Sequence, residues 1–200
     1  MSTMPLAVIL ALGASLCGAT ATAQPAPQPR VVIDTDAGQI EIELDATRAP
    51  RTAANFLRYV DEQFFDRTSF YRTVTPGNQP DNLIKIAVIQ GGADGTRAAH
   101  DAIALERTSV SGLKHLDGAV SMARNGPDTA TSEFFICVGD QPELDFGGRR
   151  NPDGQGFAAF GRVVKGLDIV KLIHERPADR QRLAPPIVIR TMRRVAPGAP

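Results

Sequence analysis

The sequence predicts a mainly β protein, an antiparallel barrel or sandwich of about eight strands with two helices. Three observations support this fold class. Short segments rich in β-branched and aromatic residues recur along the chain. Only two segments carry the apolar spacing of an amphipathic helix. These helical segments do not alternate with the strands, which argues against a doubly wound parallel sheet.

The first segments of the folded unit predict a hairpin followed by a helix. Residues 31–36 and 39–44 flank a short turn, and apolar and polar residues alternate in the second of them, as in a half-buried strand. Pro50 follows, at a position where the first turn of a helix tolerates proline. Beyond it, apolar residues recur with the spacing i, i+3, i+4, i+7: Ala53, Phe56, Leu57 and Val60.

The remaining segments predict six more strands and the second helix. Residues 69–74 have the composition of a strand, and strict alternation would place Phe70 and Arg72 on the same face. The second helix is expected over residues 167–174. The other strands are expected at 86–90, 119–123, 133–138, 158–164 and 187–195.

Length and charge limit the classes of function. The chain has 200 residues, of which 42% are hydrophobic, and its 22 basic and 22 acidic side chains cancel. Such a chain is long enough to form one domain with a closed core. Zero net charge provides no field to hold a polyanion, so neither a nucleic acid nor a membrane is expected as a partner of the mature chain. We expect a monomer.

The N-terminus predicts a cleaved signal peptide over residues 1–23. Residues 5–16 form an apolar run of the length found in signal peptides, and Ala21-Thr22-Ala23 fits the rule for the cleavage site. We therefore expect a periplasmic or secreted protein that begins at Gln24. A lipid anchor on Cys17 and a buried N-terminal helix are the alternatives. The expected organisation is a signal peptide (1–23), a Pro-rich tail (24–30), one folded domain (31–195) and a disordered tail (196–200).

The pattern of a conventional catalytic or metal site is missing from the sequence. There is no Gly-rich phosphate loop and no nucleophile elbow. The histidines His100, His115 and His174 lack the close spacing of metal ligands, so no metal or cofactor is expected. His100 and His115 are interpreted as turn and surface groups. Cys137 lies in a predicted strand, where a buried, inert thiol is expected.

Five segments occur in an order that points to one family. They are residues 49–56, 70–74, 88–92, 121–136 and 160–163. Together they resemble the cyclophilin family of peptidyl-prolyl cis-trans isomerases, and the resemblance runs from about residue 31 to residue 195. It implies a closed eight-stranded antiparallel β-barrel capped by two α-helices. It also implies an isomerase of X-Pro bonds in unfolded or folding polypeptides that uses no cofactor.

The resemblance assigns Arg72 as the catalytic residue. A fixed hydrogen-bond donor aimed at the prolyl nitrogen would stabilise the twisted amide more than either planar form. Gln90 would orient this arginine, and Phe135 would form the floor of an apolar cup for the proline ring. The substrate-binding residues expected are Phe70, Val88, Gln90, Ala123, Arg124, Glu133, Phe135, Leu144 and Phe157.

Several positions depart from the family pattern. Ala87 stands where an aromatic residue commonly lines the cup, and Phe157 stands where a histidine is found and could replace the lost apolar area. Glu143 stands where a tryptophan often contributes to cyclosporin binding, so weak sensitivity to that drug is expected. Glu133 replaces the usual glutamine, and we expect it to pair with Arg72, either locking the guanidinium or competing with the substrate for it.

Two inserted loops also distinguish the chain. The first inserted loop (78–85) and the second inserted loop (147–156) are expected to frame the substrate groove. Ala87 favours an alternative function, a cyclophilin-like module that binds proline-containing segments with little turnover. The joint presence of Arg72, Gln90 and Phe135 favours the enzyme.

Overall fold

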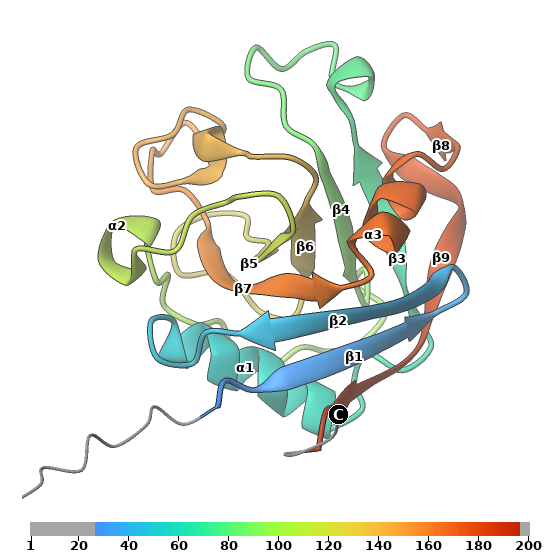
Figure 1. Ribbon diagram of the computed structural model, residues 1–200. Helices are drawn as coiled ribbons and strands as arrows, with labels where there is room; N and C mark the ends of the chain where they lie inside the picture. The colour runs from blue at the N-terminus through green and yellow to red at the C-terminus, as the bar shows by residue number, and fades with distance from the viewer. Residues whose placement is uncertain (1–26, 197–200) are drawn as a thin grey trace, which may run out of the picture.

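The computed structural model describes residues 27–196, which form nine strands, three α-helices and two short 3₁₀ helices, η1 (Pro76–Asn78) and η2 (Pro142–Leu144) (Figure 1). The predicted signal peptide and Cys17 lie outside these residues. The strands are β1 (Arg30–Thr35), β2 (Gly38–Leu44), β3 (Thr68–Val74), β4 (Val88–Gly92), β5 (Ala119–Met122), β6 (Phe134–Cys137), β7 (Ala158–Lys165), β8 (Ala178–Asp179) and β9 (Arg182–Arg194). The helices are α1 (Pro50–Asp61), α2 (Thr108–Ser111) and α3 (Leu167–His174).

Eight of the strands close into an antiparallel barrel, which confirms the predicted fold class. Their order is β1-β2-β7-β5-β6-β4-β3-β9, and β9 pairs back onto β1. The first and last strands of the domain therefore lie side by side (Figure 1). The two residues of β8 extend β9 as a hairpin. Closure leaves these eight strands without a free edge on which another chain could pair.

Two of the three helices are the predicted ones, and α2 is additional. A helix of four residues has no second turn in which apolar spacing could repeat, so periodicity does not detect α2. Helix α1 begins with Pro50, and its first turn is capped from a distant loop. The Glu106 carboxylate accepts hydrogen bonds from the backbone N–H groups of Arg51 and Thr52, at 3.0 and 2.7 Å. This carboxylate satisfies donors that have no partner within the helix.

The main core fills the barrel. Phe56 of α1 lies at its centre, with ring centroids 5.1–5.4 Å from those of Phe65, Phe134 and Phe160. Offset and edge-to-face contacts of this kind add to the stability gained by burying the rings. The aromatic cluster holds α1 against the barrel. None of the helices within residues 27–196 is both long enough and apolar enough to cross a membrane.

A second, smaller core lies on the other face of the same strands. Alternate residues of β6 point in opposite directions, so Phe134 and Ile136 join the barrel core. Phe135 and Cys137 face the second core, whose other members are Val74, Ile86, Val88, Ala119 and Leu144. Cys137 is fully buried, as predicted, and burial raises the pKa of its thiol. This second core underlies the site described next.

Candidate active site

A cavity of about 410 Å³ opens beside the second core and is lined by residues of β3, β4 and β6, of the segment after β5 and of the second inserted loop. Nine of the ten residues expected at the site line this cavity: Arg72, Val88, Gln90, Ala123, Arg124, Glu133, Phe135, Leu144 and Phe157. Seven further residues line it that the sequence did not single out for the site: Tyr71, Ile86, Asn125, Thr129, Thr131, Arg150 and Asn151.

The remaining expected residue, Phe70, does not line the cavity, and the prediction that it shares a face with Arg72 is wrong. The pairing of β3 with both β4 and β9 shifts between Phe70 and Arg72, which makes a bulge at Tyr71. Tyr71 and Arg72 both face the cavity as a result. Phe70 is fully buried in the barrel core, 5.7 Å from Phe134. A strictly alternating pattern does not reveal a bulge, and for this reason Tyr71 was not among the residues expected at the site.

The guanidinium of Arg72 is held from two sides. Its Nη1 donates to Oε1 of Gln90 at 2.8 Å. Its Nε and Nη2 both donate to Oε1 of Gln181, at 3.0 and 2.5 Å. Gln181 lies between β8 and β9, 109 residues away along the chain, and no sequence pattern signals it. Burial lowers the pKa of Arg72, and no carboxylate within residues 27–196 forms an ion pair with it.

The expected pair between Glu133 and Arg72 is not formed. Oε2 of Glu133 instead accepts a hydrogen bond from the hydroxyl of Tyr71 at 2.8 Å. Its Oε1 accepts from the backbone N–H groups of Ala93 and Asp94, at 2.9 and 3.1 Å. Burial is the main cause that raises the pKa of this carboxyl above its ordinary value. The carboxylate is therefore engaged with three donors and does not compete with a substrate for Arg72.

The floor and one wall of the cavity are apolar. Phe157 packs edge-on against Phe135, with ring centroids 5.3 Å apart and planes at 87°. Ile86 lines the cavity, whereas its neighbour Ala87, which stands where the family commonly has an aromatic residue, does not. Ile86 and Phe157 therefore supply apolar surface to the cavity in addition to Val88, Phe135 and Leu144, whereas Ala87 supplies none. Glu143 does not line the cavity and pairs with Arg149.

His115 is not a surface group, which corrects the interpretation from the sequence. Its side chain is buried, and its ring stacks on that of Phe135 with centroids 5.9 Å apart. Nδ1 lies 2.8 Å from Oδ1 of Asp145, and Nε2 lies 2.9 Å from Oγ of Ser121. The floor of the cavity thus rests on an imidazole whose two nitrogens both have partners. No group of three or more potential metal ligands occurs among the residues that the structure describes.

The comparisons with known proteins agree with this geometry. Residues 30–194 match the family described as cyclophilin type peptidyl-prolyl cis-trans isomerase/CLD. The chain belongs to this family. It is 36% identical over 148 residues to peptidyl-prolyl cis-trans isomerase A of Dickeya dadantii, covering 72% of this chain and 70% of that protein. It is 36% identical over 175 residues to a peptidyl-prolyl cis-trans isomerase of Acinetobacter baylyi, covering 86% and 84%.

Solved cyclophilins have the same fold. A Cryptosporidium parvum cyclophilin, crystallised in the presence of the dipeptide Ala-Pro, superposes with a TM-score of 0.68 at 21% identity. The alignment covers 84% of this chain and 99% of that one. The protein is therefore an isomerase of the cyclophilin family with the closed barrel of that family.

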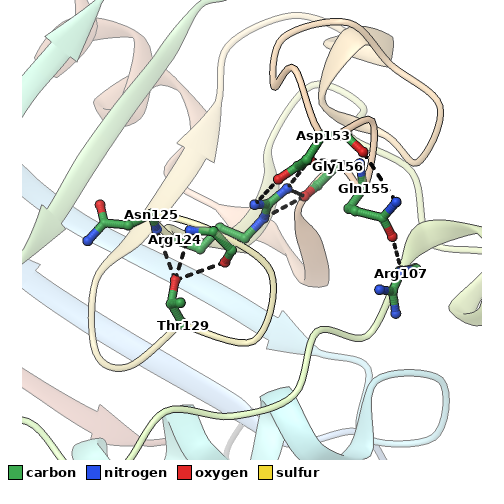
Figure 2. A network of polar contacts seen from close by, with 8 residues as sticks. Arg107, Arg124, Asn125, Thr129, Asp153, Gln155 and Gly156 are labelled. Carbon is green, nitrogen blue, oxygen red and sulfur yellow. Dashed lines mark hydrogen bonds and ion pairs between the residues drawn. The ribbon is translucent and has the colours of Figure 1, made fainter.

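In this cyclophilin-type isomerase, Arg124 anchors the second inserted loop (Figure 2). Its guanidinium, almost fully buried, donates to both carboxylate oxygens of Asp153 at 2.7 and 2.9 Å and to the carbonyl of Gly156 at 2.8 Å. The hydrogen bond from Arg124 lowers the pKa of Asp153 to about 2. Arg107 holds the same loop through Oε1 of Gln155, at 2.6 Å. Arg124 thus contributes to the cavity wall with its charge already compensated.

Arg150 joins the two inserted loops, of which only the second contributes residues that line the cavity. Its Nη1 donates to Oε1 of Gln79 at 2.8 Å and to the carbonyl of Ile84 at 2.7 Å. Arg150 and Asn151 of the second loop line the cavity. Burial and the neighbouring charge of Arg72 lower the pKa of Arg150. This single side chain therefore fixes how the two loops meet.

Proposed function

We propose that the protein accelerates rotation about X-Pro bonds of folding exported proteins, and that Arg72 stabilises the twisted amide. The observation that carries the proposal is the guanidinium of Arg72, held by Gln90 and Gln181 on the wall of a cavity that has Phe135 as its floor. The ligand class is a proline-containing polypeptide. The Cryptosporidium parvum cyclophilin was crystallised with a dipeptide of this class.

An X-Pro bond isomerises slowly because the barrier to rotation is high. Rotation about a peptide bond breaks amide resonance, and the barrier is about 18–20 kcal/mol. In the twisted state the prolyl nitrogen regains its lone pair and accepts a hydrogen bond, which neither planar form offers. An N–H of Arg72 aimed at this nitrogen would lower the barrier, because the interaction is stronger in the transition state than in the ground states.

The apolar cup supplies the orientation. A proline ring seated on Phe135, between Val88 and Leu144, would leave its nitrogen directed at the polar wall that carries Arg72. Burying the ring removes apolar surface from water and fixes the ring while the preceding carbonyl turns. Because Gln90 and Gln181 hold Arg72 before a substrate arrives, little reorganisation is needed during the reaction.

The test is the cis-to-trans rate of a short X-Pro peptide with the wild type and with Arg72→Ala. We expect the variant to lose about 10²-fold in kcat/KM, as when one donor to a developing charge is removed, and to retain peptide binding. Equal rates would refute the role of Arg72. Binding without acceleration by the wild type would support the alternative function, a binding module.

We further propose that the protein acts outside the cytoplasm as a monomer. The apolar run at residues 5–16 and the cleavage pattern ending at Ala23 support export. Mass spectrometry of the protein from fractionated cells tests this, with Gln24 expected as the first residue and the periplasm or medium as the location. An intact N-terminus in the cytoplasm, or a lipid on Cys17, would contradict it. Sedimentation measures the oligomeric state.

A further inference from the structure

Three hydrogen bonds join Glu133 to Arg72 in an unbroken chain. The hydroxyl of Tyr71 donates to Oε2 of Glu133 at 2.8 Å. Nε2 of Gln90 donates to the same hydroxyl at 2.6 Å, and Nη1 of Arg72 donates to Oε1 of Gln90 at 2.8 Å. All four side chains line the cavity. The two ends of this hydrogen-bonded chain are the carboxylate of Glu133 and the guanidinium of Arg72, which do not touch each other.

The two ends of this chain set the direction of its bonds, because a guanidinium only donates hydrogen bonds. A carboxylate only accepts hydrogen bonds, so the Tyr71 hydroxyl must donate to it. The oxygen of that hydroxyl is then left to accept from the amide nitrogen of Gln90, and the amide oxygen of Gln90 faces Arg72. The two ends of a glutamine amide have nearly the same shape and opposite polarity. The carboxylate of Glu133 and the guanidinium of Arg72 therefore favour the same orientation of the Gln90 amide, with its oxygen toward Arg72.

A glutamine at position 133 would reverse the direction of the hydrogen bond between residue 133 and Tyr71. The backbone N–H groups of Ala93 and Asp94 point at Oε1 of residue 133 and require an acceptor there. The amide oxygen would have to take that place, and its NH₂ group would then face Tyr71 as a donor. The hydroxyl of Tyr71 would accept this bond and turn its hydrogen toward Gln90. The amide of Gln90 would then either flip and set its NH₂ group against the N–H groups of Arg72, or stay in place and lose its hydrogen bond to Tyr71; in both cases Arg72 would be held less firmly.

We propose that Glu133 is a positioning residue for Arg72 and acts through Tyr71 and Gln90. The proposal rests on the function proposed above, in which Arg72 acts on the X-Pro bond. Glu133 itself touches neither Arg72 nor, in this scheme, the reacting nitrogen. Its contribution is to keep an acceptor turned toward the guanidinium, which keeps the remaining N–H groups of Arg72 aimed into the cavity.

The scheme makes activity depend on the charge of Glu133. The titratable groups that face this carboxyl are Tyr71 from β3 and Asp94 after β4, and Asp94 pairs with Arg182 of β9 at 2.6 Å. Protonated Glu133 would donate to Tyr71, as a glutamine would. The Tyr71 hydroxyl would then turn its hydrogen toward Gln90 in the same way. Activity is then present above the pKa of Glu133, which burial raises, and is lost as the pH falls through it.

The experiment measures kcat and KM on an X-Pro peptide from about pH 4 to pH 8. The proteins are the wild type, Glu133→Gln, Tyr71→Phe, the double variant, and Glu62→Gln as a matched control. Glu62 lies at the end of α1, paired with His100 and away from the cavity. Thermal melting of each variant reports whether it is folded.

We expect Glu133→Gln and Tyr71→Phe each to lower kcat about three- to tenfold, the equivalent of one hydrogen bond, with little change in KM. The double variant should be no slower than the slower single variant, because both changes break the same chain. The fall in activity at acid pH should be present in the wild type and in Glu62→Gln. This acid fall should be absent from Glu133→Gln and from Tyr71→Phe.

Additive losses in the double variant, unchanged kcat in both single variants, or an acid limb that persists in Glu133→Gln would each overturn the proposal. If one variant fails to fold, the pH profile of the other decides. If the wild type does not accelerate the peptide at all, the proposed function fails, and the positioning chain is still tested by NMR. The side-chain amide signals of Gln90 should then move in Glu133→Gln and not in Glu62→Gln, and unchanged signals would refute the chain.

Discussion

His115 and Phe135 stack with their ring planes 14° apart, so a buried imidazole supports the floor of the cavity. The imidazole is itself fixed by Asp145 on one nitrogen and Ser121 on the other. A polar group buried in this way is stable only while its partners remain. The position of Phe135 therefore depends on a polar cluster beneath the second core as well as on apolar packing.

Replacing His115 by alanine should destabilise the protein by about 2–4 kcal/mol. The change leaves a void under Phe135 and removes one hydrogen-bond partner of the buried Asp145 carboxylate. Urea unfolding measures the loss, and KM for a proline peptide should rise because the floor is no longer held. His100→Ala is the control, since His100 is half-exposed and lies away from the cavity. Equal stability of the two variants would contradict the prediction.

Asp145 should stabilise the protein above about pH 4 and cease to do so in more acid solution. Burial alone would raise its pKa, but hydrogen bonds from His115 and Lys114 outweigh burial and hold the pKa below its ordinary value. A carboxyl whose pKa is lower in the folded state adds stability above its unfolded pKa of about 3.9 and loses it as the pH falls below. Urea midpoints between about pH 3 and pH 6 should decline less steeply for Asp145→Asn than for the wild type. Parallel curves would rule out this linkage.

Gly92 should not tolerate a side chain. Its φ is +145°, and a Cβ there would lie 2.3 Å from Oε2 of Glu133, so the carboxylate would have to move. We expect Gly92→Ala to destabilise the protein by about 2 kcal/mol or more and to lower activity. Gly95→Ala is the matched control, because its φ is also positive, at +74°, but nothing lies within 4 Å. A loss of about 1 kcal/mol is expected there, and an equal loss in both variants would show that contact with Glu133 is unimportant.

Arg150→Gln should weaken peptide binding with little effect on thermal stability. The variant loses the hydrogen bonds through which Arg150, at the cavity wall, holds the two inserted loops together, at Gln79 and Ile84. We expect KM to rise about three- to tenfold, which corresponds to roughly one hydrogen bond. Arg149→Gln should leave KM unchanged, since Arg149 is exposed and does not line the cavity. A rise in KM shared by both variants would point to loss of charge in the loop instead.

Local patterns predicted much of this molecule. Helix α3 has the predicted bounds, Leu167–His174, because its apolar residues repeat within two turns of the chain. The segment predicted as a strand at 133–138 contains β6, and Phe135 faces the cavity as the resemblance implied. The family resemblance added the barrel and nine residues of the cavity, since motifs in the right order imply a topology that periodicity alone leaves open.

The sequence by itself thus determined the elements, the family and most of the cavity lining. The tertiary structure decided how the polar groups are partnered. Gln181 reaches Arg72 from 109 residues away, Glu133 engages Tyr71 instead of Arg72, and the bulge in β3 turns Phe70 inward. Each of these depends on the register between strands and on the paths of loops. Hydrophobic periodicity specifies which face of a strand is buried, but hydrogen-bond partners form between segments that only the closed barrel brings together.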